Sequence, residues 1–132
     1  MRVIQPDGWK RPRGYSNAIV AEGRVLFVSG CVGWDEKEQF HSDDLVEQVR
    51  QALKNVLTLL EAGGARPEHV ARMTWYITDK REYMKRGKEI GAVYREMMGA
   101  HYPAMSMVQV SALMEDRARV EIEATAVIPD GG

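Results

Sequence analysis

Apolar residues recur three and four positions apart between residues 45 and 60, which predicts a long amphipathic helix. Ser42, Asp43 and Asp44 precede this run and supply a cap and negative charge for the start of a helix. Gly63 and Gly64 follow it and supply a left-handed stop. The stripe consists of Leu45, Val49, Leu53, Val56, Leu57 and Leu60.

A second helix is predicted after Asp79. Asp79 and Glu82 have the spacing of a capping box, and an apolar stripe then continues as far as Gly99. Basic residues in this segment alternate with Glu82 and Glu89, which is typical of a solvated helix face. The apolar stripe consists of Tyr83, Ile90, Val93, Tyr94 and Met97.

Three segments alternate between apolar and polar residues with a period of two, which predicts strands over 70–78, 104–113 and 119–128. In the last of them, Glu121 and Glu123 lie on the face opposite Ile122. The turn-like residues 114–117 separate the final two segments.

Two further apolar runs, 18–21 and 25–29, flank the short turn at 22–24, where Gly23 can adopt positive φ. This arrangement predicts a β-hairpin. Its second arm is almost wholly apolar, and we expect that arm to be buried on both faces of a sheet.

The predicted order is β-β-α-β-α-β-β, an α+β fold in a single domain over residues 1–132, with two helices on one face of a mixed sheet. No element remains to cover the opposite face, although that face also carries apolar groups among its polar ones, for example Met105 and Met107 opposite Val108 and Val110. We therefore expect the sheets of several copies to pack together in a cyclic oligomer.

The charge balance argues against large anionic partners. The formal net charge is −1 and acids are interspersed with bases, so neither nucleic acid nor an anionic membrane is expected as a partner. No uncharged apolar run approaches the length of a membrane span. The single cysteine, Cys31, cannot form an internal disulfide, and this favours the reducing cytoplasm.

Few residue clusters suit cofactor chemistry. His41, His69 and His101 lie far apart in sequence, so no metal is expected. No glycine-rich loop links a strand to a helix start, which disfavours nucleotide cofactors. Cys31 fits either a nucleophile or a buried small residue. Glu121 is either paired with a basic residue such as Arg119 or Arg72, or used in chemistry.

Several short motifs together resemble the RidA/YjgF family of enamine and imine deaminases, which is also labelled the L-PSP endoribonuclease family. Their combination and order are specific, and the resemblance extends from Tyr15 to Ile128. The motifs are 15–18 (Tyr-Ser-Asn-Ala), 25–30 (Val-Leu-Phe-Val-Ser-Gly), 51–56 (Gln-Ala-Leu-Lys-Asn-Val), 93–94 (Val-Tyr) and 120–126 (Val-Glu-Ile-Glu-Ala-Thr-Ala).

The resemblance implies a chorismate-mutase-like fold and a homotrimer with clefts between its subunits. It implies cofactor-free hydrolysis of a small-molecule enamine or imine to a 2-keto acid and ammonia. The glutamate that holds the attacking water corresponds to Glu121, the backbone element to Gly30 and Cys31, and a pocket tyrosine to Tyr15.

The chain departs from this family at one position. The deaminases read Pro-x-Arg where this sequence reads Pro103-Ala104-Met105, and that arginine clamps the substrate carboxylate. Because a thioether cannot replace a guanidinium, substrate binding loses on the order of 2–5 kcal/mol.

Three functions therefore remain open. The first is a divergent deaminase acting on a less ionic or differently anchored substrate, such as an aminomuconate-like enamine. In it, Met105 and Met107 form an apolar wall, and His101, Arg117 or Arg119 serves as a displaced anion anchor. The second is a non-catalytic homologue that binds a metabolite or protein. The third, an endoribonuclease, is least favoured because no basic stripe with interleaved aromatics is present.

Overall fold

The computed structural model describes residues 1–131. Its main sheet has four strands in the order β3-β6-β4-β5, and a separate two-stranded ribbon is formed by β1 and β2. The strands are β1 (Arg2–Ile4), β2 (Ala18–Val20), β3 (Arg24–Val32), β4 (Val70–Ile77), β5 (Ala104–Gln109) and β6 (Val120–Ile128). The helices are α1 (Leu45–Ala62), η1 (Pro67–His69), α2 (Lys80–Lys85) and α3 (Gly87–Met98).

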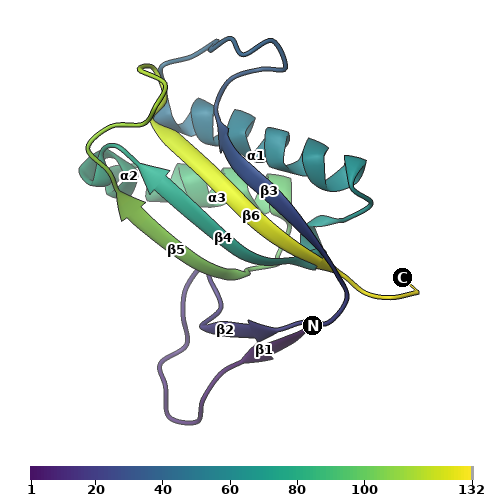
Figure 1. The fold of residues 1–132 in the computed structure, drawn as a ribbon. Coiled ribbons are helices and arrows are strands. Elements are labelled where there is room, and N and C mark those ends of the chain that lie inside the picture. The colour runs from purple at the N-terminus through teal and green to yellow at the C-terminus, as the bar shows by residue number, and fades with distance from the viewer. Residues whose placement is uncertain (132) are drawn as a thin grey trace.

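The helices form one layer behind the sheet, and no element among residues 1–131 covers the other face of the sheet (Figure 1). β6 is antiparallel to both of its neighbours, β3 and β4, while β4 and β5 are parallel and joined through α2 and α3. Along β6 every second side chain, beginning with Val120, is buried against the helices. The α+β fold predicted from the sequence is therefore confirmed.

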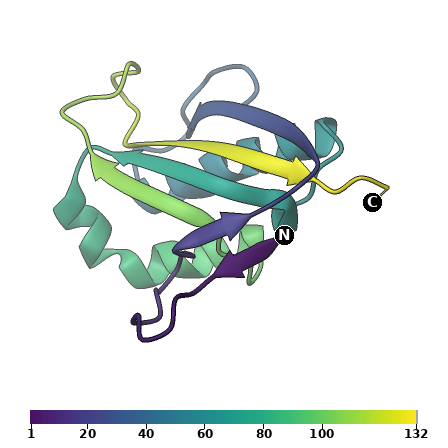
Figure 2. The same ribbon diagram turned by 60° about the horizontal axis from the view of Figure 1, so that its bottom comes forward.

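The predicted hairpin of residues 18–21 with 25–29 is wrong. β2 pairs with β1 in the ribbon below the sheet, and β3 pairs with β6 (Figures 1 and 2). At Gly23 the backbone approaches the end of β6 so closely that a Cβ would lie 2.0 Å from the carbonyl oxygen of Ile128. The glycine thus permits β3 to join the longer ladder of β6 instead of folding back on β2.

The prediction that the second arm is buried on both faces is also wrong. β3 is an edge strand, with Val28 facing the helices and Val25 and Phe27 on the open face. Phe27 is 78% exposed in the single chain. The apolar sequence of β3 therefore comes from side chains on an uncovered face of the sheet and not from a strand buried on both faces.

The predicted second helix is divided at Arg86, whose φ of −98° and ψ of 14° interrupt the helical path between α2 and α3. The guanidinium of Arg86 contacts both Asp44 and Glu89, which stabilises this break. The strand predicted over 104–113 ends at Gln109, because the following residues form the loop that leads into β6.

Candidate functional site

A β-bulge brings Gly30 and Glu121 together on the open face. Val28 pairs with Ala124 and Cys31 with Ile122, so β3 has one more residue than β6 between these pairs. Gly30 lies in the bulge, and a Cβ there would be 2.5 Å from Oε2 of Glu121. The absence of a side chain at position 30 is therefore what leaves room for the carboxylate.

Cys31 contributes its backbone and not its thiol to this region. Its side chain is buried in the core, where the Sγ–H lies 3.5 Å from the carbonyl oxygen of Ser29. Burial, together with the charge of Glu121, raises the pKa of the thiol. A protonated, buried thiol fits the interpretation of Cys31 as a small core residue.

Glu121 has no ion pair or hydrogen bond with any residue between 1 and 131. Arg119 instead pairs with Glu82 at 3.0 Å, and Arg72 donates to the hydroxyl of Ser106 at 3.3 Å. On the same strand, Glu123 is engaged by the hydroxyl of Tyr76 at 2.7 Å. Of the two glutamates, Glu121 is the one whose carboxylate has no hydrogen-bond or ion-pair partner among residues 1–131.

Met105 and Met107 lie on the opposite face of the sheet. They pair in register with Met73 and Trp75, whose side chains point into the helical layer. Met105, Met107 and Trp75 line a cavity of about 300 Å³ between β5 and the helices. The aromatic residues around this cavity are Trp75, Tyr83, Tyr94 and Tyr102.

Tyr15 is held beside the two methionines by the segment that follows it. The backbone N–H of Ser16 donates to Pro103 at 3.0 Å, and its hydroxyl donates to the carbonyl oxygen of Tyr102 at 2.5 Å. A depression contiguous with the aromatic cavity is lined by Tyr15, Met105 and Met107. The structure therefore brings these three predicted residues together.

His101 links two segments of the chain through hydrogen bonds. Its Nε2 lies 2.6 Å from the carbonyl oxygen of Val70, and its own carbonyl accepts a hydrogen bond from Tyr94. These bonds fix the segment that leads into β5, next to a depression that His101 shares with Tyr15.

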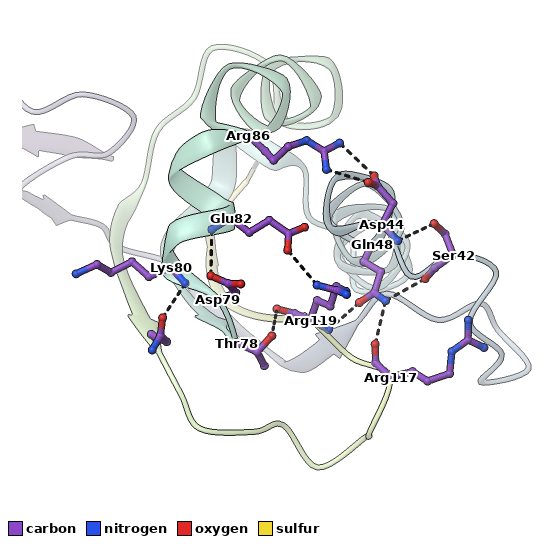
Figure 3. A network of polar contacts seen from close by, with 11 residues as sticks. Ser42, Asp44, Gln48, Thr78, Asp79, Lys80, Glu82, Arg86, Arg117 and Arg119 are labelled. Atoms are coloured by element: carbon purple, nitrogen blue, oxygen red, sulfur yellow. Dashed lines mark hydrogen bonds and ion pairs between the residues drawn. The ribbon is translucent and has the colours of Figure 1, made fainter.

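Arg117 and Arg119 belong to a polar network at the other end of the sheet (Figure 3). Arg117 forms an ion pair with Asp43 at 3.0 Å, and Arg119 forms one with Glu82 at 3.0 Å. Their backbones are joined by buried Gln48, which donates to the carbonyl of Arg117 and accepts from the N–H of Arg119. Both arginines are therefore engaged in stabilising the loop before β6.

The candidate residues form two groups that do not converge within one chain. Glu121, Gly30 and the backbone of Cys31 lie on the open face, whereas Met105 and Met107 lie towards the helices, with Tyr15 beside them. Because alternate residues of a strand point to opposite faces, no side-chain rotation brings the groups together.

Two arginines that line this cavity were not predicted from the sequence. Arg13 and Arg95 line it, and neither forms an ion pair or side-chain hydrogen bond with another of the 131 described residues. Arg13 precedes the first resemblance motif, and Arg95 is one of several basic residues on its helix. Only the tertiary structure distinguishes them from solvated surface charges.

Two other kinds of feature are absent from residues 1–131. No group of three or more histidine, cysteine or acidic side chains is arranged to hold a metal ion. None of the helices in this range is long and apolar enough to cross a membrane.

Comparisons with known proteins agree with one another. The sequence profile described as Endoribonuclease L-PSP matches residues 9–128. A RutC family protein of Pyrococcus horikoshii is 36% identical over 126 residues, covering 94% of this chain and 95% of that protein. The human 2-iminobutanoate/2-iminopropanoate deaminase is 31% identical over 114 residues, covering 86% of this chain and 79% of the human protein.

Two solved structures are also similar to this chain. A Rid family protein of unknown function from Yersinia pestis superimposes with a TM-score of 0.82 at 33% identity, covering 96% of this chain and 98% of the other. The structure of TdcF from E. coli with bound serine gives a TM-score of 0.69 at 29% identity, covering 98% of this chain and all of that one.

Proposed function

The chain belongs to the Endoribonuclease L-PSP family, which includes the Rid proteins, and from this premise we propose that it hydrolyses a reactive enamine or imine at clefts between copies of itself. The observation that carries the proposal is the unpaired Glu121 carboxylate against the bare backbone of Gly30. Relatives named as 2-iminobutanoate/2-iminopropanoate deaminases support imine deamination as the family-level activity.

In the proposed reaction, Glu121 accepts a proton from a water molecule as its oxygen bonds to the imine carbon. The C=N electron pair moves to nitrogen, which takes that proton and gives a carbinolamine. Glu121 then accepts the hydroxyl proton as the C=O bond forms, and it returns this proton to nitrogen as the C–N bond breaks. Water and the imine are thus converted into a 2-keto acid and ammonia, with the glutamate regenerated.

The open sheet face supports an oligomer of this chain. Val25, Phe27 and Val108 are exposed large apolar side chains on this face or its edge strands. We propose that two further copies cover it in a homotrimer, with the cavity of one subunit facing Glu121 of the next. This arrangement joins the two groups of residues that a single chain keeps apart, and it requires neither a metal nor a cofactor.

A non-catalytic homologue is the second candidate, and Met105 is the observation that favours it. An arginine there would hold a substrate carboxylate, whereas the thioether provides only apolar contact. In this alternative the same clefts bind a metabolite without converting it. For both candidates we propose a cytoplasmic location, which the single buried thiol of Cys31 favours.

The proposal is tested by ammonia release from enamines generated enzymatically in the presence of the protein, including 2-aminoacrylate and 2-aminomuconate. The wild type should accelerate release from at least one substrate, and Glu121→Gln should lower that acceleration about 10²- to 10⁴-fold. Glu123→Gln is the matched control, because Glu123 is already bonded to Tyr76.

Two further results bear directly on this proposal. Met105→Arg should increase hydrolysis of 2-aminoacrylate if the rest of the site is intact. No acceleration by the wild type across the panel would favour the non-catalytic alternative.

A further inference from the structure

We propose that the cavity between β5 and the helices selects a planar, unsaturated or aromatic substrate whose carboxylate is held by Arg13 and Arg95. This inference rests on the proposed function, which supplies the reacting imine. It adds the kind of side chain that the substrate carries and the two arginines that bind its carboxylate.

The wall of the cavity is suited to a flat apolar group. Tyr94 and Tyr102 stack with their ring centroids 5.4 Å apart and their planes at 16°, and Trp75 lies 6.4 Å from Tyr94. The sulfur atoms of Met105 and Met107 add polarizable contacts that favour aromatic partners. A volume of about 300 Å³ is about twice that of a cavity known to hold benzene, so a ring with a short chain fits.

One hydrogen-bond donor in this wall has no partner. Nε1 of Trp75 is the one side-chain nitrogen or oxygen that is buried and unpaired among the described residues, and Trp75 as a whole is 1% exposed. With an accessible area below 1 Å², this nitrogen is not exposed to the cavity, so Trp75 contributes the apolar surface of its ring to the wall.

The rim supplies the positive charge that Met105 does not. Arg13 lies in the segment that Ser16 fastens to the start of β5, and Arg95 lies on α3. A Cβ at Gly91 would lie 3.6 Å from Nη1 of Arg95, so this guanidinium rests over the bare glycine at the cavity wall. Two guanidinium groups without acidic partners beside an apolar cavity complement a ligand with a ring and a carboxylate.

Calorimetric titration of the full-length protein with phenylpyruvate and pyruvate, two possible product 2-keto acids, tests this inference. We expect phenylpyruvate to bind at least about tenfold more tightly than pyruvate, and Arg13→Gln with Arg95→Gln to weaken phenylpyruvate binding about tenfold. Arg81→Gln, which alters an exposed arginine of α2 outside the cavity, should leave affinity unchanged. Gly91→Phe should abolish binding by filling the cavity.

The outcomes separate this inference from the proposed function. Equal affinities for the two keto acids, or an equal loss in Arg81→Gln, would overturn the inference, even if the protein hydrolyses 2-iminopropanoate in a Glu121-dependent way. Tight, Arg13-dependent and Arg95-dependent binding of phenylpyruvate, retained in Glu121→Gln, would support it. Such binding without hydrolysis of any imine would refute the proposed function alone.

Discussion

Replacing Gly30 by alanine should displace the proposed catalytic carboxylate while leaving the fold intact. The new Cβ would lie 2.5 Å from Oε2, 2.7 Å from Cδ and 2.9 Å from Cγ of Glu121. Because non-bonded heavy atoms approach to about 3.5 Å, the carboxylate must move by about 1 Å. A shift of this size in a reacting group costs up to about 10²-fold in rate.

The collision involves the end of a flexible side chain, and Gly30 is exposed without positive φ. We therefore expect kcat to fall about 10- to 100-fold while the free energy of unfolding changes by less than about 1 kcal/mol. Ammonia release from the best enamine substrate and chemical denaturation measure the two quantities. In the Glu121→Gln background the same substitution should have little further effect on rate, because the displaced group is already inactive. Additive losses in the double variant would refute the proposed link between Gly30 and Glu121.

Three further predictions concern helix α3, the N-cap of helix α1 and the open face of the sheet. Gly91→Ala should raise the free energy of unfolding by about 0.5–1 kcal/mol in thermal denaturation, because this helix-interior glycine has room for a methyl group. Arg86 holds the pKa of Asp44 below its usual range, so the ionised carboxylate stabilises the fold above the unfolded pKa, and this stabilisation is lost as pH falls through the folded pKa. Asp44→Asn should therefore lower the free energy of unfolding by about 0.5–1 kcal/mol at neutral pH and leave it unchanged below the folded pKa. Chemical denaturation at several pH values measures this difference. Phe27→Asp should shift the sedimentation coefficient to that of a monomer, whereas Met84→Asp, at a similarly exposed position on α2, should not.

The regular elements were predictable because their patterns are local. The stripe of α1 and the alternation of β6 follow from sequence periodicity, and both segments lie as expected. Strand pairing was not predictable in the same way, since residues 18–20 pair with residues 2–4 across an irregular segment. The apolar run of β3 was misassigned because an edge strand with an uncovered apolar face has the same composition as a buried one.

The candidate site was only partly visible in the sequence. The family resemblance pointed to Glu121 and Gly30, and the bulge explains their contact. The opposite orientation of Met105 follows from strand register, which no local motif reveals. Arg13 and Arg95 come to line one cavity only through tertiary packing, so sequence reasoning instead suggested Arg117 and Arg119, which form ion pairs elsewhere in the structure.

Mixing two inactive variants tests most directly whether each site is shared between neighbouring copies. Glu121→Gln disables one half of the site and Gly91→Phe the other, so a hybrid ring contains interfaces in which both halves are intact. Equal mixing of the unfolded chains followed by refolding should restore about a quarter of wild-type deaminase activity, the fraction of head-to-tail interfaces with two intact halves. Hybrid rings confirmed by native mass spectrometry that remain inactive would contradict the shared site.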